Sequence, residues 1–414
     1  MPIKSTSRVL SLLAVAFVLL SASWGTAQER RAADLEIYRD RGWQLSAQAL
    51  ASTYLDKLWH ASGTPGFSVA VFRDGELLFS KGVGYADLEN LVPATPTTVY
   101  NVGSVSKAIT AVAVMQLVAN GSVALDDPIQ KYVPTFPEKR WPVTVRQLLT
   151  HTSGIRHYRE SSVPEACGFD TQWEPCASLA EAITLFADDP LLFEPGTYYR
   201  YSSYGVNLLQ GVVETASGMG FEAYLRQRVW QPAGMLRTSF DRPERIVPGR
   251  ASGYVVEGAE IQNHPWESVG YKWASGGMLS TAEDLGRLGV ALLQGRVLDP
   301  ATVKLMFTPQ LGDGILYYQG EDPPEPLRWQ QAFIWRIRQD QAGRSYVHHC
   351  GTVKGFNACL ILYVNEKLVV ATADNAASLG LWPGLALADI FRRTAAGATE
   401  IPVGATSTQT QSQQ

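Results

Sequence analysis

Residues 101–107 of this chain read NVGSVSK, and residues 107–120 read KAITAVAVMQLVAN. The second stretch is almost wholly apolar and stops at Gly121, which indicates a buried helix. Ser104 and Lys107 stand three residues apart where this helix starts, so both side chains lie on one helical face. A serine hydroxyl is a weak nucleophile, which a lysine can activate when burial lowers the lysine pKa. By itself the junction fits a nucleophilic serine and a capping serine beside a solvated lysine equally well.

The segments before this junction predict a helix and then a hairpin. Residues 32–61 carry a helical pattern, and residues 67–84 read FSVAVFRDGELLFSKGVG, with the turn pair Asp74-Gly75 between two alternating runs. Beyond the junction the periodic segments up to about residue 300 predict helices, at 143–150, 178–187, 204–217, 220–230 and 281–294.

After about residue 328 the pattern changes to period two. The runs RWQQAFIWRIR, YVHHC, NACLILYV and KLVVATA predict consecutive antiparallel strands, and a last helix is predicted near 381–394. The predicted fold class is α+β: one antiparallel sheet built from both chain ends, flanked by helices, with a mainly helical lobe inserted. We assign 32–96 and 328–394 to the sheet lobe and 97–327 to the helical lobe of one domain, 28–394. The Thr-, Ser- and Gln-rich residues 395–414 are predicted to be disordered.

The composition excludes several classes of protein. The 414 residues are 46% hydrophobic and 18% charged with a net charge of −4, so the chain can bury a large core and has no basic footprint for nucleic acid. No H-E-x-x-H pair, P-loop or dinucleotide fingerprint occurs, so we expect neither a catalytic metal nor a cofactor. No G-x-S-x-G elbow is present, which argues against an α/β-hydrolase.

The N-terminus predicts export. Lys4 and Arg8 precede the apolar residues 9–20, and small residues follow up to Ala27, a pattern typical of a secretory signal cleaved near Ala27. An uncleaved anchor is the alternative, although the apolar core is short for a membrane span. The mature chain is then periplasmic or secreted and has no membrane span.

Export allows disulfides, so the four cysteines become candidates for pairing. Cys167 and Cys176 bracket a polar stretch, where a bridge would close a surface loop. Cys350 and Cys359 flank GTVKGFNA between two predicted strands, where either a cross-strand bridge or two buried thiols would fit.

Two further segments support the Ser104 assignment. Residues 195–203 read PGTYYRYSS before a predicted helix, and residues 349–356 read HCGTVKGF between two predicted strands. Together with HTSGIRHY (151–158) and ASGGMLSTAEDLGRL (274–288), these segments make the chain resemble the serine β-lactamase and penicillin-binding-protein superfamily over about 65–390. The resemblance is strongest to the class C-like branch (peptidase S12 type), which contains class C β-lactamases, D-amino-acid peptidases, family VIII esterases and the mitochondrial serine β-lactamase-like protein.

The resemblance implies a role for each matching residue. Ser104 would be the acylated nucleophile, Lys107 its proton acceptor, and Tyr201 the proton relay to the leaving group. His349 falls on the first position of the family's K-T-G or H-x-G element. The backbone N–H groups of Ser104 and Thr352 would form the oxyanion hole.

Two positions depart from the family pattern. Ser203 replaces the asparagine of Y-x-N, and His349 replaces the lysine of K-T-G, so the site lacks that permanent cation. Ser203 and Gly351 would still contact the substrate. His151 is interpreted as a structural residue. Lys354 is close in sequence, and whether it reaches the site is open.

These departures favour an exported serine hydrolase that acts on a small ester, amide or peptide through a Ser104 acyl-enzyme. One alternative is a non-catalytic penicillin-binding-like or assembly protein that keeps the fold. Another is a D,D-peptidase or β-lactamase proper. The oligomeric state is not predicted.

Overall fold

The computed structural model describes residues 46–158, 178–258, 260–265, 268–312, 314–320 and 322–395. Residues 51–388 form one compact unit, and the outer ends of helices α3 (Ala47–Ser62) and α13 (Trp382–Ala395) belong to another. The predicted signal segment 1–27, residues 396–414 of the predicted tail, and Cys167 and Cys176 lie outside the described residues.

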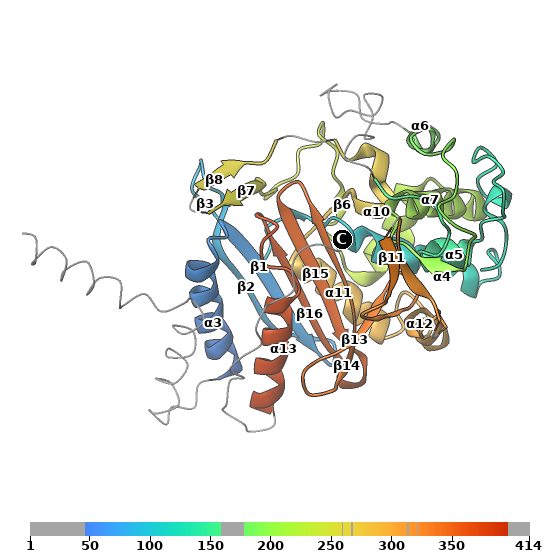
Figure 1. The fold of residues 1–414 in the computed structure, drawn as a ribbon. Coiled ribbons are helices and arrows are strands. Elements are labelled where there is room, and N and C mark those ends of the chain that lie inside the picture. Colours follow the sequence, from blue (N-terminus) through green and yellow to red (C-terminus); the bar gives the residue numbers. More distant parts are fainter. Residues whose placement is uncertain are drawn as a thin grey trace, which may run out of the picture. The chain divides into compact units, whose positions relative to one another are not determined.

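The centre of the larger unit is an eight-stranded antiparallel sheet. Its strand order is β12-β13-β14-β15-β16-β1-β2-β3 (Figure 1). The strands are β1 (Gly66–Arg73), β2 (Glu76–Asp87), β3 (Val92–Pro93), β12 (Gln330–Gln331), β13 (Arg336–Gln339), β14 (Ser345–Val353), β15 (Phe356–Tyr363) and β16 (Leu368–Asp374).

The two chain ends meet where β16 pairs with β1, with Phe67 opposite Asp374. The β1–β2 hairpin turns at Asp74 and Gly75, which have φ angles of 52° and 93°. Positive φ at both turn residues matches the right-handed twist of the strands, so a D-G pair is favoured there. The predicted fold class, an antiparallel sheet from both ends of the chain, is confirmed.

Helices cover both faces of the sheet. A Cβ added at Gly289 in α11 (Ala282–Leu293) would lie 2.6 Å from Val369, and Gly384 in α13 lies against Val370. Adjacent residues of a strand point to opposite faces, so α11 and α13 pack on opposite faces of β16. Glycine lets α11 approach the sheet closely.

The remaining helices gather beside β14 around α4 (Val105–Ala119) (Figure 1). Every α4 residue from Val105 to Met115 is buried, as expected for a helix that is surrounded by protein. The others are α5 (Val145–Leu149), α6 (Leu179–Thr184), α7 (Ser203–Ser217), α8 (Phe221–Tyr224), α9 (Gln231–Ala233), α10 (Trp273–Gly276), α12 (Pro300–Phe307), the π-helix η3 (Leu225–Trp230) and the short 3-10 helices η1 (Ile129–Lys131) and η4 (Gly270–Lys272). A further 3-10 turn, η5 (Val364–Glu366), joins β15 to β16 in the large sheet.

Three small sheets complete the unit. Their strands are β4 (Tyr100–Asn101), β5 (Tyr198–Tyr199), β6 (Ser239–Phe240), β7 (Tyr254–Glu257), β8 (Glu260–Asn263), β9 (Met278–Ser280), β10 (Leu316–Gln319) and β11 (Asp322–Pro326).

The structure differs from the sequence prediction in several places, and the short strands β5 to β11 were not predicted. The run 328–338 is not one strand: β12 and β13 are separated by 332–335, all buried, with Ile334 at a φ of 68° and bonded from its N–H to Leu149 O. Its apolar residues fill a core turn, which period-two counting cannot distinguish from a strand. Helix α12 was missed, although Asp299 caps it and Pro300 is its first residue.

Candidate active site

Ser104 lies at the junction of β4 and α4 that the sequence predicts. It is the residue before the helix, with φ −65° and ψ −6°, and its side chain makes no capping bond to the α4 backbone. Gly103 has a φ of 48° and donates its N–H to Asn101 Oδ1 at 3.0 Å. A side chain would be strained at this left-handed position, so glycine lets the chain turn into the helix and leaves the Ser104 hydroxyl available.

Two predicted partners meet at the Ser104 hydroxyl. Lys107 Nζ donates to Ser104 Oγ at 2.9 Å, and the Tyr201 hydroxyl donates to the same oxygen at 2.8 Å. Lys107 Nζ also lies 4.8 Å from the centre of the Tyr201 ring. The structure therefore brings Ser104, Lys107 and Tyr201 together from α4 and from the segment just before α7.

Lys107 is fully buried, and its Nζ also donates to Ser275 O at 2.6 Å. Burial holds the Lys107 pKa well below its ordinary value of 10.5, and the nearby charges of Lys272 and Arg336 lower it further. All three effects disfavour the ammonium form. A neutral amine has a lone pair, so Lys107 can accept the Ser104 proton while it keeps its bond to Ser275 O.

Burial has the opposite effect on Tyr201, whose pKa it raises above the ordinary value of 10.0. The phenol thus stays protonated and can act as a proton donor. Its ring packs against His151 at 4.5 Å and edge-on against His157 at 5.3 Å between ring centres. His151 Nδ1 in turn accepts from Ser202 N at 3.3 Å, in keeping with a structural role that fixes the residue after Tyr201.

Strand β14 approaches the Ser104 turn very closely at Gly351. A Cβ at Gly351 would lie 2.2 Å from Ser104 N, and a Cβ at Gly103 would lie 2.9 Å from Thr352 N. Both glycines are therefore required by the contact. The backbone N–H groups of Ser104 and Thr352, which are predicted to form an oxyanion hole, lie on opposite sides of this contact.

Asn357 fixes the peptide between Gly351 and Thr352. Its Nδ2 donates to Gly351 O at 3.1 Å and to Thr352 Oγ1 at 3.0 Å. In a trans peptide the N–H points away from the C=O, so the Thr352 N–H is directed away from Asn357. This orientation suits an N–H group that donates to an oxyanion on the side of β14 away from Asn357.

His349 lies near this group but makes no hydrogen bond to Ser104, Lys107 or Tyr201 among the described contacts. It is 1% exposed, with Nδ1 2.7 Å from Cys350 O. Burial holds its pKa well below 6.5, helped by Arg336 and Lys107. The neutral imidazole supplies no positive charge to the site.

Ser203, the second residue that departs from the family pattern, is the first residue of α7 and is buried. Its backbone N–H donates to His157 Nδ1 at 3.1 Å. Burial lowers the His157 pKa to about 3, and Lys107 and Arg200 add to this effect. A neutral histidine thus accepts from the start of α7.

Lys354, whose position the sequence left open, forms an ion pair with an acidic side chain. Its Nζ lies 3.1 Å from Asp241 Oδ2. Cys350 and Cys359 are opposite each other in β14 and β15 and form a disulfide with a Cα–Cα distance of 4.1 Å. Of the two alternatives for this pair, the cross-strand bridge is the one present.

Sequence reasoning missed four residues that shape the site: His157, Lys272, Ser275 and Arg336. Ser275 and Lys272 come from the α10 region, more than 160 positions after Lys107. Ser275 belongs to the quoted segment ASGGMLSTAEDLGRL, whereas no quoted segment contains Lys272. His157 belongs to the quoted segment HTSGIRHY, which was the available signal.

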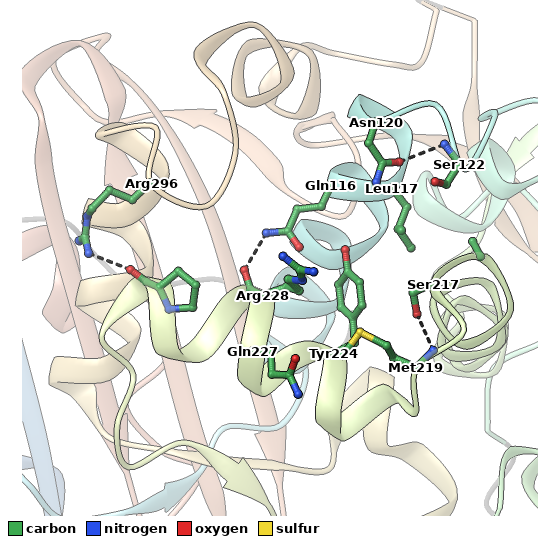
Figure 2. Close-up of a pocket in the computed structure, with 12 residues that line it drawn as sticks. Gln116, Leu117, Asn120, Ser122, Ser217, Met219, Tyr224, Gln227, Arg228 and Arg296 are labelled. Carbon is green, nitrogen blue, oxygen red and sulfur yellow. Dashed lines mark hydrogen bonds between the residues drawn. The ribbon is translucent and has the colours of Figure 1, made fainter.

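A cavity of about 550 Å³ lies near the other end of α4 (Figure 2). It is lined by Gln116, Leu117, Tyr224 and Arg228 among others, and by none of the predicted site residues. Within the described part of the chain, no cluster of three or more His, Cys, Asp or Glu residues could hold a metal ion. None of the described helices is long and apolar enough to cross a membrane.

Comparisons with known proteins show the family of the chain. The family model described as Beta-lactamase matches residues 51–379. Serine beta-lactamase-like protein LACTB, mitochondrial, of Homo sapiens is 30% identical over 420 residues, covering 80% of this chain and 74% of the relative.

Solved structures share the fold. The octameric penicillin-binding protein homologue from Pyrococcus abyssi has a TM-score of 0.68 and 26% identity, covering 85% of this chain and 78% of its own. EstCE1, a hydrolase with promiscuous acyltransferase activity, has a TM-score of 0.67 and 22% identity, covering 83% of this chain and 98% of its own, which shows the fold alone. With the family match and the human relative, the chain belongs to the beta-lactamase family of serine hydrolases.

Proposed function

We propose that the protein is a serine hydrolase that cleaves a small ester, amide or peptide through an acyl-enzyme on Ser104. The observation that carries this proposal is the pair of hydrogen bonds from Lys107 Nζ and the Tyr201 hydroxyl to one serine oxygen. A buried lysine with a lowered pKa and a tyrosine with a raised pKa give a base and an acid on the same nucleophile.

In the acylation step, neutral Lys107 accepts the Ser104 proton as Oγ attacks the substrate carbonyl. The backbone N–H groups of Ser104 and Thr352 would hold the oxyanion, which exists only in the tetrahedral transition state and intermediate. Tyr201 would then give its proton to the leaving group as the bond breaks, and would recover a proton from Lys107. Water attacks the resulting ester on Ser104, releases the acid and restores the hydroxyl.

A dedicated β-lactamase or D,D-peptidase is less favoured than a general ester, amide or peptide hydrolase. The family lysine that would carry a permanent charge is His349, which is buried and neutral. A non-catalytic protein is disfavoured because Lys107 keeps both its bond to Ser104 and a lowered pKa.

We also propose that this chemistry takes place outside the cytoplasm, in the periplasm or after secretion. Two features support the location: the signal-like pattern of residues 1–27 and the Cys350–Cys359 disulfide. Cell fractionation that left the protein in the cytoplasm would refute the location and not the chemistry.

The proposed activity is tested with a panel of p-nitrophenyl esters, D- and L-aminoacyl amides and nitrocefin. We expect turnover of at least one ester or amide by the wild type, and its loss in Ser104→Ala. Ser106→Ala is the matched control for a nearby serine in α4. Equal turnover by wild type and Ser104→Ala would refute the proposal, and so would no turnover of any substrate by folded wild type.

A further inference from the structure

We propose that the cavity at the C-terminal end of α4 is a second binding site, for a small organic carboxylate that also carries a hydroxyl group. Its volume of about 550 Å³ is in the range of small-molecule sites. Gln116, which lines the cavity, follows Ser104 by more than three turns of α4, so the two residues are about 18 Å apart along the helix axis. The cavity is therefore separate from the proposed active site.

Gln116 gives the cavity wall a buried hydrogen-bond acceptor. Its Nε2 donates to Arg228 O and to Val297 O, both at 2.8 Å. This contact fixes the orientation of the amide, because the reversed orientation would place oxygen against two carbonyl oxygens. Oε1 is therefore on the other side of the amide, and no group of the described residues donates to it. A buried acceptor without a donor is costly, so a ligand hydroxyl that donated to it would bind favourably.

Two side chains that can donate to an anion lie beside Gln116. Figure 2 shows the Arg228 guanidinium and the Tyr224 hydroxyl next to the Gln116 side chain, and all three residues line the cavity. Burial raises the Tyr224 pKa above its ordinary value of 10.0, although the nearby charge of Arg228 opposes the rise. The phenol thus stays protonated near pH 7 and keeps its O–H donor.

The charge of the cavity favours an anion. Its lining residues include Arg228 and Arg296 and no acidic residue. Among the described residues, the Arg228 side chain has no ion pair and no hydrogen bond, whereas Arg226 on the same helical segment is paired with Glu222 at 2.9 Å. A concave surface lined by one sign of charge concentrates ligands of the opposite sign.

A carboxylate fits this group better than a phosphate. One guanidinium lies beside Gln116 and Tyr224, and its planar fork of donors matches the two oxygens and the single charge of a carboxylate. Arg296 lies apart from them in Figure 2, and its Nη1 donates to Pro232 O at 3.0 Å. A phosphate monoester carries almost two charges near pH 7, so one guanidinium would leave part of that charge unbalanced.

The backbone that carries Arg228 is itself unusual. Arg228 belongs to η3, the π-helix between α8 and α9. A π turn is rare, and it is found frequently at functional sites. Because Gln116 Nε2 donates to Arg228 O within this turn, α4 holds in place the segment that carries the cation. The same side chain therefore fixes the backbone of the cation and offers Oε1 to the ligand.

The test measures binding of three hydroxy acids of increasing size: 3-hydroxybutanoate, 3-hydroxybenzoate and 4-hydroxyphenylacetate. Each is compared with its neutral amide and with its O-methyl ether by ligand-observed NMR on the wild type. For at least one acid we expect affinity about 10-fold above that of the amide, as for a charged hydrogen bond, and roughly fivefold above that of the ether. If none of the acids binds more tightly than its amide, the inference is wrong. Equal binding of acid and ether would refute the hydroxyl contact with Gln116.

Variants assign the binding to this cavity. Arg228→Gln should abolish the preference for the acid over the amide, and Arg228→Lys should retain part of it. Arg226→Gln is the matched control, since Arg226 is exposed, has the same charge and is not among the residues that line the cavity. A preference that survives in Arg228→Gln, or that falls equally in Arg226→Gln, would overturn the inference.

Two further measurements complete the test. Tighter binding of phenyl phosphate than of every hydroxy acid would refute the carboxylate class. Because the cavity does not contain Ser104, the Ser104→Ala protein should give the same affinities as the wild type. Loss of the preference in Ser104→Ala would place the binding at the proposed active site and overturn the inference. The hydrolysis assays can fail or succeed independently of these affinities.

Discussion

The two ends of helix α4 differ, because one end holds the candidate catalytic residues and the other borders a cavity. At the N-terminal end, Ser104 Oγ accepts from two side chains, one of them a fully buried lysine. The C-terminal end borders a cavity of about 550 Å³ where Arg228 is exposed and Gln116 donates to the backbone of Arg228 (Figure 2). The cavity offers room but no buried, pKa-shifted acid and base on one nucleophile. Burial of titratable side chains, more than cavity size, marks the candidate active site.

The strongest test of this contrast is Lys107→Met, which keeps the side-chain bulk and removes the base. We expect kcat/KM for the best ester to fall roughly 1,000-fold, because general-base catalysis contributes on this scale and its partners act as a unit. Circular dichroism and thermal unfolding would verify the fold. A folded Lys107→Met protein with more than a tenth of wild-type activity contradicts the role of Lys107.

Tyr201→Phe removes one hydroxyl and keeps the ring against His151. We expect a loss of about 100-fold in kcat/KM, since proton transfer to the leaving group is slowed while Lys107 remains. The loss should be smaller for esters with more acidic leaving groups, which need no proton. A loss that is the same for every leaving group would show that Tyr201 only positions Ser104.

The pH profile provides a sharper test of the charges at this end of α4. Because the Lys107 pKa lies well below 10.5, kcat/KM should rise with pH through the Lys107 pKa and level off above it. Lys272 is the nearby charge that contributes most to that lowering. In Lys272→Met the Lys107 pKa rises, so the ascending limb should move to higher pH.

Lys354→Met is the control for the pH profile, because Lys354 is paired with Asp241 and is not among the charges acting on Lys107. The ascending limb of its pH profile should stay in place. If the ascending limb of Lys272→Met also stays in place, it reports the titration of a group other than Lys107.

The smallest effect is expected at the other end of the helix. Arg228→Ala changes an exposed side chain that lines the cavity. This cavity borders the end of α4 opposite to Ser104. Steady-state kinetics should change by less than about twofold and stability by less than about 0.5 kcal/mol, as for most surface substitutions. A tenfold loss of activity would mean that the two ends of α4 are coupled.

Much of the fold could be predicted from periodicity and turn residues. The Asp74-Gly75 hairpin, the apolar helix after Ser104 and the last three strands were all visible in the sequence, because each is a local pattern of burial or of backbone conformation. Residues 332–335 were misread, since four consecutive buried residues fit a strand as well as a core turn.

The candidate site could be predicted only in part. Ser104 and Lys107 share one helical turn, so spacing alone brings them together, and the family resemblance supplied Tyr201. Ser275 O and Lys272 reach Lys107 from an element whose distance in sequence carries no periodic signal. The neutral state of His349 depends on its burial in the folded sheet, which its position in a motif does not reveal.

The central claim, that Ser104 is the nucleophile, is tested most directly by labelling with a fluorophosphonate and locating the adduct by peptide mass spectrometry. We expect one adduct per chain, on the peptide that contains Ser104, with labelling lost in Ser104→Ala and strongly slowed in Lys107→Met. An adduct on a different residue, or equal labelling of Ser104→Ala, would contradict it.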